Sequence, residues 1–262
     1  MTGLIKNEIY KFFKQKKFYL FMGVMIAVQL VNILQYQADS REQASFLLNG
    51  QSYPLEALAE SSLFIIMFLA IFIAESIAEE YKRGTFKLVL LRPVTRVQFL
   101  IAKSAGVLVC ICFMVVFTTL TAYGTGFFFL GWGEQLMVQG EPLFSKGGSI
   151  YGGEGIMLTY TAAFAYILPV FGFAMLLMFI ALLSLNVGIT IGSALALFIF
   201  APLLNGGITA YSIVHIMNAF PVLFINQEAS REILFDTGII FVYIVIFYIG
   251  SLIFIKKKDV LL

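Results

Sequence analysis

Charged residues are scarce in this sequence of 262 residues: Asp, Glu, Lys and Arg make up 12%, while 60% of the side chains are hydrophobic. A soluble domain carries about 25% charged residues, so this composition excludes a separate soluble domain. We expect a chain dissolved in lipid, with room for several spans of about 20 residues each. We expect no cleavable secretory signal, because the first apolar run is long enough to span and no clear small-residue cleavage site follows it.

Histidine, cysteine and phosphate-binding loops are equally sparse. His215 is the single histidine, which disfavours a metal-dependent membrane protease that needs a histidine pair. Cys110 and Cys112 point in different directions on a helix, so we interpret them as small apolar residues rather than a disulfide or metal site. No GxxxxGK[ST] phosphate loop occurs. The sequence therefore predicts a non-enzymatic chain without a metal or cofactor of its own.

The long apolar runs predict an all-α integral membrane protein with one transmembrane domain over residues 1–262. We place six spans at about 18–34, 58–78, 99–130, 160–183, 187–204 and 237–255. Residues 35–58 are predicted to form a polar loop and 131–158 a glycine-rich loop. Asn186 is predicted to turn or cap the tight hairpin between the fourth and fifth spans. Residues 213–225 are apolar but too short to cross and contain Pro221, which predicts short re-entrant or external helices.

Charge placement supports this topology. Five lysines lie within residues 1–17, six basic residues within 82–103 and three lysines at 256–258, which together are fourteen of the seventeen. The positive-inside rule then puts both termini and the segment between the second and third spans in the cytoplasm, for a chain in the cell membrane.

The N-terminal arm has the pattern of an amphipathic helix. Its apolar side chains lie close to one helical face, with lysines on the flank. We interpret it as an interfacial helix lying along the membrane surface; a solvated basic leader is the alternative. The residues on the apolar face are Leu4, Ile5, Ile9, Phe12 and Phe13.

The longest polar passage on the predicted cytoplasmic side is Glu79–Ser104, between the second and third spans. A helix is predicted to enter it and to stop at Gly84, which readily adopts the left-handed cap conformation. A short helix, Phe86–Leu91, is predicted to end before Pro93. Thr95 begins the next helix with a capping-box pattern. The short helix has the character of a docking surface.

Polar groups inside the predicted spans allow two interpretations. They could contact a substrate, but hydrogen bonds between helices are the more frequent explanation. These groups are Gln29, Asn32, Thr118, Thr119 and Tyr123. Glu75, near the end of the second span, is expected to pair with a basic residue of the N-terminal arm rather than to serve an ion path. Gly188 and Gly192 would let two helices approach closely, within the chain or between copies.

The central passage resembles the first cytoplasmic loop of ABC transporter permeases of the ABC-2 exporter family. In that family an E-x-x-x-G-T element precedes a short apolar helix, and P-[VI]-[ST]-R precedes the third span. The matching residues are Glu80, Gly84, Thr85, Pro93, Val94, Thr95 and Arg96. The ending IKKKD at 255–259 also resembles the usual terminus of the family. The EExxxR signature of one intramembrane protease family is not matched, because Gly84 or Thr85 stands where its arginine should be.

The resemblance implies a membrane subunit of an ABC exporter. It would dimerise with a second copy or a related permease, contact membrane lipids and no nucleic acid, and dock a separate ATPase that binds ATP and Mg. The short helix would be the coupling helix, with charge pairs around it that set its register. The residues implied in coupling are Glu79, Glu80, Arg83, Gly84, Thr85, Phe86, Leu88, Leu91, Arg92, Pro93 and Arg96.

The substrate implied by an apolar interior is a hydrophobic drug, peptide or lipid. Three alternatives remain at this point. The charges could be no more than a solvated positive-inside loop, the chain could be an ATPase-independent carrier or channel, or it could be a scaffold or immunity membrane protein. An ion-coupled carrier is disfavoured, because no predicted span carries a row of buried charges.

Overall fold

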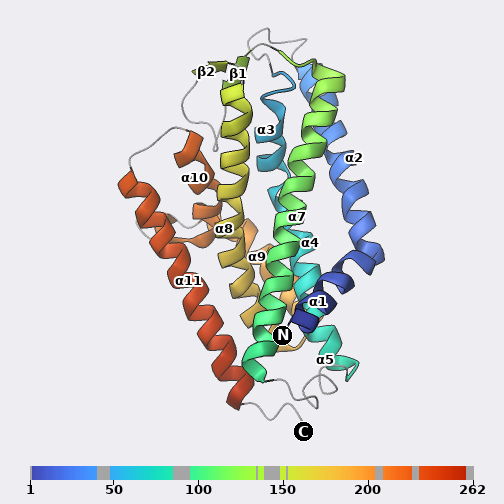
Figure 1. Cartoon of the computed structure of the whole chain (residues 1–262), viewed down its shortest axis with the longest axis vertical. Coiled ribbons are helices and arrows are strands. Elements are labelled where there is room, and N and C mark those ends of the chain that lie inside the picture. The colour runs from blue at the N-terminus through green and yellow to red at the C-terminus, as the bar shows by residue number, and fades with distance from the viewer. Residues whose placement is uncertain are drawn as a thin grey trace.

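A computed structural model of the chain shows an elongated bundle of helices (Figure 1). It describes residues 2–39, 48–84, 95–133, 135–138, 148–151, 153–203, 209–225 and 230–257. Five helices in these ranges are long and apolar enough to cross a membrane. They are α2 (Lys16–Asp39), the run Ser62–Lys82, α7 (Arg96–Leu130), α8 (Gly153–Ser184) and α11 (Ser230–Lys257). The fold is therefore that of an integral membrane protein built from helices.

The second of these helices contains a change of helix type. It consists of α4 (Ser62–Ala74), the π-helical segment η1 (Glu75–Glu79) and α5 (Glu80–Lys82). The π-helix has a wider turn than the α-helix and occurs mostly as single-turn insertions, often at functional sites. Nothing in the sequence pattern predicted it.

The predicted fifth span, 187–204, does not reach the length of the others. It contains α9 (Val187–Phe200), which has 14 residues, followed by the 3-10 turn η2 (Ala201–Leu203). Fourteen helical residues extend about 21 Å, whereas a span takes about 20 residues. Five helices rather than six meet this length among the described residues, and the six-span topology stays a prediction.

Two predicted loops contain regular structure. The end of the loop 35–58 and the first residues of the predicted second span form α3 (Tyr53–Glu60). Pro54 favours this helix as a residue of its first turn, and the helix buries Tyr53, Leu55 and Leu58. The glycine-rich loop 131–158 holds an antiparallel pair, β1 (Gln135–Val138) with β2 (Gly148–Tyr151), in which Gln135 pairs with Tyr151. Because α8 begins at Gly153, the fourth long helix starts seven residues earlier than expected.

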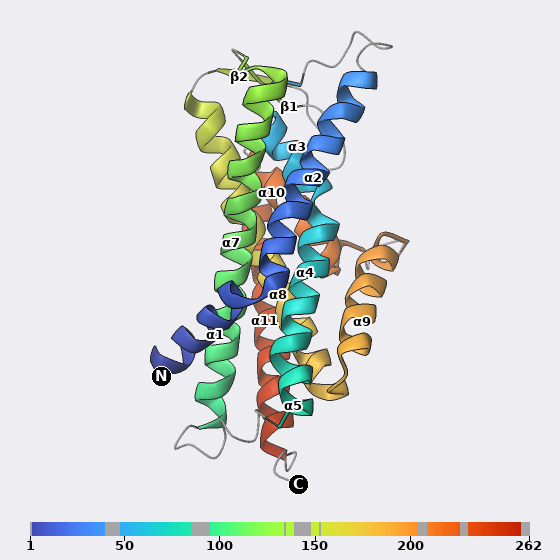
Figure 2. The ribbon, with the colours of Figure 1, turned by 90° about the vertical axis from the view of Figure 1, so that its right-hand side faces the viewer.

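The other short elements are α1, the two strands, η3 and α10. α1 (Thr2–Lys14) lies across α7 near the end where α5 ends, α7 begins and α11 ends (Figure 2). We call this the basic end. The strands and α3 lie at the opposite end (Figure 1). The 3-10 turn η3 (Thr209–Tyr211) and α10 (Ile213–Ile225) follow η2, and α10 packs on α8 and α11.

A single large hydrophobic cluster joins most of the helices, with α8 near its centre. Phe173 and Leu177 of α8 are fully buried, as are Leu69 and Ile73 of α4. Cys110 is buried in the same cluster and Cys112 is partly buried, and both are free thiols, as the sequence led us to expect. α11 is different, because only Ile240, Ser251 and Ile255 of this helix are buried.

Three predicted helix boundaries are confirmed. Gly84 has a φ of +72°, the left-handed conformation expected at the end of the second long helix. Thr95 and Gln98 form a reciprocal capping box at the start of α7. The Asn186 side chain accepts hydrogen bonds from the backbone of Gly188 and Ile189, so it caps α9.

Candidate functional site

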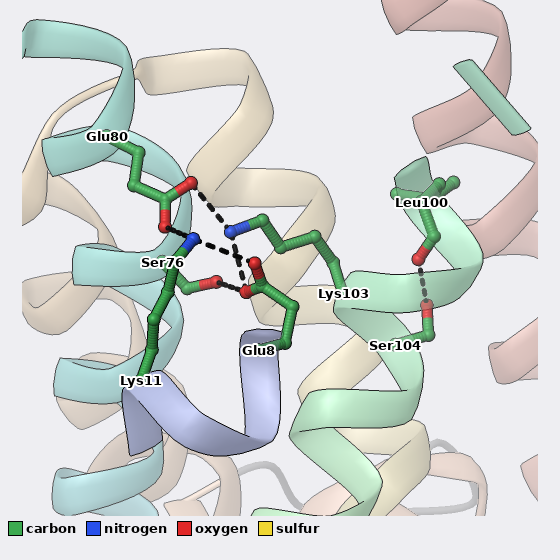
Figure 3. Close-up of polar contacts among 7 residues, drawn as sticks. All are labelled: Glu8, Lys11, Ser76, Glu80, Leu100, Lys103 and Ser104. Carbon is green, nitrogen blue, oxygen red and sulfur yellow. Dashed lines mark hydrogen bonds and ion pairs between the residues drawn. The ribbon is translucent and has the colours of Figure 1, made fainter. Parts of the chain in front are cut away.

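Four charged side chains from three helices form a closed cluster at the basic end (Figure 3). Lys103 Nζ of α7 lies 2.8 Å from Glu8 Oε2 of α1 and 2.8 Å from Glu80 Oε2 of α5. Lys11 Nζ of α1 lies 2.9 Å from Glu8 Oε1 and 2.6 Å from Glu80 Oε1. Each carboxylate therefore bridges both ammonium groups. We call Glu8, Lys11, Glu80 and Lys103 the charge cluster.

The charge cluster is partly buried and electrically balanced. The Lys103 side chain is only 1% exposed, and Glu8 accepts a further hydrogen bond from Ser76 Oγ at 3.4 Å. Burial raises the pKa of Glu8, but the charges and hydrogen bonds of Lys103 and Lys11 outweigh it, so this pKa lies below its ordinary value. Burial would lower the pKa of Lys11, but the hydrogen bond to Glu80 and the charge of Glu8 raise it overall.

The position of Glu8 follows from the amphipathic pattern of α1. Glu8 and Phe12 are four residues apart, so they share the helical face that packs on the bundle, and both are buried. Phe12 makes edge contacts with the rings of Phe72 and Phe113. The apolar face therefore carries one carboxylate into the protein, and Lys103 meets it.

Glu75 has the partner that the sequence predicted for it. Its carboxylate is paired with Lys17, at the start of α2, so the expected contact with the N-terminal arm is confirmed. Glu75 begins η1 and Glu80 directly follows η1. The carboxylates at the start of the π-helical segment and directly after it thus both bind lysines of the N-terminal arm.

Arg96, at the other end of the central passage, binds the last helix. Its Nη1 atom donates hydrogen bonds to the backbone carbonyls of Ile255 at 2.6 Å and Lys256 at 2.8 Å. These carbonyls belong to the last turn of α11, where the helix itself provides no donor and a cation is favoured. Arg96 therefore ties the first turn of α7 to the end of α11.

The other predicted coupling residues fall into two groups. Glu79 and Arg83 are paired on the exposed surface, one helical turn apart, at 2.5 Å. The predicted short helix lies outside the described residues, so the structure gives no account of it. The coupling residues in that group are Thr85, Phe86, Leu88, Leu91, Arg92 and Pro93.

A cavity of about 590 Å³ adjoins the charge cluster, between α1 and the segment formed by η1 and α5. Charged residues of both signs line it, including Lys14, Lys17, Glu75, Glu79 and Arg83. Across the described ranges, His, Cys, Asp and Glu side chains nowhere gather in threes around a possible metal ion. The cavity is thus a charged recess without the ligand set of a metal centre.

Four of the five predicted mid-membrane polar groups donate hydrogen bonds within the chain. Gln29 Nε2 of α2 donates to the backbone carbonyl of Thr118 at 2.9 Å, and Asn32 Nδ2 donates to the carboxylate of Glu60. The hydroxyl groups of Thr118 and Thr119 donate to carbonyls of their own helix. These contacts favour packing between helices. A role of these groups, with Tyr123, in substrate passage stays a prediction.

Sequence reasoning missed three charged residues. Glu8 was not noticed on the apolar face of the N-terminal arm, and Lys103 was counted only as one more positive charge. Glu60 lies within the predicted second span, yet it is exposed and contacts Asn32 of α2. A carboxylate on the apolar face of an amphipathic helix, together with a lysine inside an apolar run, was the available signal for the charge cluster.

The apolar helices and the gathering of basic residues at one end define a multi-pass membrane protein. Residues 4–144 match the sequence profile described as ABC-2 family transporter protein. This match covers more than half of the chain and includes all four residues of the charge cluster, and the chain belongs to this family of membrane transport permeases. No curated protein matches the sequence.

Proposed function

We propose that this chain is the membrane-spanning subunit of an ATP-driven exporter and docks a separate ATPase through residues 85–94. One observation carries the proposal: a charged residue on each side of this segment is bonded to other helices. Glu80 is bonded to α1 and α7, and Arg96 to the end of α11. A displacement of the segment would therefore move α1, α7 and α11 together.

The remaining parts of the proposal follow from chemistry and family membership. ATP and Mg would be bound by the ATPase, and a second copy or a related permease would complete the membrane part. The positive-inside rule supports a cytoplasmic membrane location with both termini and the basic end in the cytoplasm. The apolar interior suits a hydrophobic drug, peptide or lipid as substrate.

The alternative is a carrier or channel that works without an ATPase. Such a protein would not depend on the apolar side chains of residues 86–91. Affinity capture of the full-length chain from solubilised membranes separates the two functions. The comparison is between the natural sequence and Leu88→Asp/Leu91→Asp, with Leu143→Asp, between β1 and β2, as control.

Recovery of an ATPase subunit with the natural sequence and Leu143→Asp, and its loss with the double variant, would support the proposal. Failure to recover an ATPase from folded natural complexes would leave the ATPase-independent carrier or channel. A second variant, Arg96→Gln, tests the mechanical connection. We expect it to retain the ATPase and to lose part of the ATP-dependent transport in proteoliposomes, because α11 is released from α7.

A further inference from the structure

A second cavity, of about 540 Å³, lies on the side of the bundle between α9 and α11. Phe173 and Leu176 of α8 form its floor, and Leu197 and Phe200 of α9 form one wall. The other wall consists of η3 and the start of α10, with Tyr243 as the single contribution of α11. None of the described residues that line it is charged. Its occupant must therefore be uncharged where it contacts the protein.

The depth of this cavity in the bilayer follows from the number of helical residues between it and the basic end, counted separately along α9 and α11. Phe200 is thirteen residues from Val187, the first residue of α9 at the basic end, which corresponds to about 20 Å. Tyr243 is also thirteen residues from Lys256, in the last turn of α11, again about 20 Å. The hydrocarbon core of a bilayer is about 30 Å thick. Both walls therefore lie at the depth of the lipid chains.

The cavity, which we call the wedge, lies on one face of α8 among residues of α9, α10 and α11. α9 and α11 each pack on α8, but within the described ranges they hardly contact one another. The turns η2 and η3 close the far end, where the Tyr243 hydroxyl donates to the Tyr211 carbonyl at 3.1 Å. The apolar space is therefore closed at the end where η2 and η3 lie.

The rim of the wedge is continuous with an apolar surface. Phe200 is 61% exposed and Tyr211 is 55% exposed at the rim. At this depth the surface contacts the hydrocarbon of the bilayer, so lipid chains have direct access to the wedge.

We propose that this cavity is a lipid site that holds one acyl chain of a bilayer phospholipid. The chain packs on α8, between α9 on one side and the start of α10 with Tyr243 of α11 on the other. This inference goes beyond the transport function and does not depend on it. It assigns a bound lipid to the part of the chain that follows the family match.

Photo-crosslinking with a phosphatidylcholine that carries a diazirine in its acyl chain tests the proposal on the full chain in lipid nanodiscs. Labelled residues are mapped by mass spectrometry for the natural sequence and for Ala196→Phe, which fills the wedge from α9. Ile199→Phe is the matched control, since Ile199 is exposed on the same helix outside the cavity. Labelling of Ile246, on the exposed face of α11, gives the level of ordinary lipid contact.

We expect Leu197, Phe200 and Tyr243 to be labelled several-fold more than Ile246. Ala196→Phe should reduce this excess to the level of Ile246, whereas Ile199→Phe should leave it unchanged. Unchanged labelling of Ile246 and an unchanged circular dichroism spectrum show that Ala196→Phe is folded. Equal labelling of the wedge and of Ile246 in the natural protein would overturn the proposal. So would displacement of the label by a compact apolar solute that the protein transports, because the wedge would then be a substrate site.

Discussion

Gly106 of α7 faces Glu8 of α1 so closely that a Cβ atom on Gly106 would lie 2.9 Å from the Glu8 Cβ. This clearance lets α1 settle on α7 at the level where Glu8 reaches Lys103, three residues before Gly106. The charge cluster therefore requires glycine at position 106 as well as its four charged side chains.

Gly106→Ala is expected to destabilise the protein by about 1–3 kcal/mol, because the added methyl group overlaps the base of the Glu8 side chain and pushes α1 away. Thermal unfolding in detergent measures the effect. Gly124→Ala, on the same helix with no atom within 4 Å of the added methyl group, is the control and should be neutral or stabilising. Equal behaviour of the two variants would contradict the close contact.

Lys103→Met removes one of two cations that bind Glu8 and Glu80 and leaves a net negative charge in a buried place. We expect a loss of about 3–5 kcal/mol in the free energy of unfolding. Adding Glu8→Gln restores neutrality, so the double variant should lose less than the sum of the two single variants. Exposed Lys82→Met is the control and should change stability by no more than about 0.5 kcal/mol.

Arg96→Gln should destabilise the end of α11, because the last carbonyls of α11 lose two charged hydrogen bonds. We expect faster hydrogen exchange in residues 250–257 and a cost of about 1–2 kcal/mol, since part of the contact faces solvent. Arg83→Gln, which breaks only an exposed pair with Glu79, should leave the exchange of this segment unchanged. If α11 exchanges at the same rate in both variants, Arg96 does not hold it.

Glu56 predicts a dependence of stability on pH. Burial, together with the nearby charge of Glu60, raises the pKa of Glu56 to about 7, from 4.5 for the free side chain. The folded state therefore binds more protons than the unfolded state between these values, and stability falls as the pH rises from about 4.5 to 7. The loss should be about 1–2 kcal/mol after allowance for solvent screening.

Glu56→Gln should remove this dependence and raise the unfolding temperature at pH 8 relative to the natural sequence. The unfolding temperatures of the variant and of the natural sequence are compared at pH values between 5 and 8. Glu154→Gln, at an exposed position in the first turn of α8, is the control and should leave the pH profile unaltered. An unchanged profile in Glu56→Gln would contradict the assigned pKa.

Local signals in the sequence predicted the helix ends well. Gly84, Thr95 and Asn186 act through their own backbone conformation or through amide groups two or three residues away, so their roles follow from short stretches of sequence. The long helices were also found, because a run of apolar residues in lipid must form helix to satisfy its backbone. The strands β1 and β2 were missed, since four-residue strands in a glycine-rich passage give no apolar alternation.

The candidate site was predicted only in outline. Glu80 and Arg96 were selected from the resemblance, but their partners, Lys103 and the carbonyls of α11, are 23 and 159 or 160 residues away. The charge of Glu8 gave no indication of a partner, because contacts between helices depend on how the helices cross and not on spacing within one of them. Glu75 was paired correctly because charge balance at one membrane boundary restricted its choice.

The π-helical segment η1 also determines the direction in which the side chains that follow it in the second long helix point. Five residues along an α-helix turn the side chain by about 140° relative to the start, whereas the wider π turn brings residues five apart close to the same side. This phase lets Glu75 and Glu80 both face the lysines of α1 and α2. The loss of one residue anywhere in 75–79 would rotate Glu80 by about 100° and point it away from Lys11 and Lys103. The length of this segment, independent of its composition, therefore determines whether the N-terminal arm and the central passage are connected.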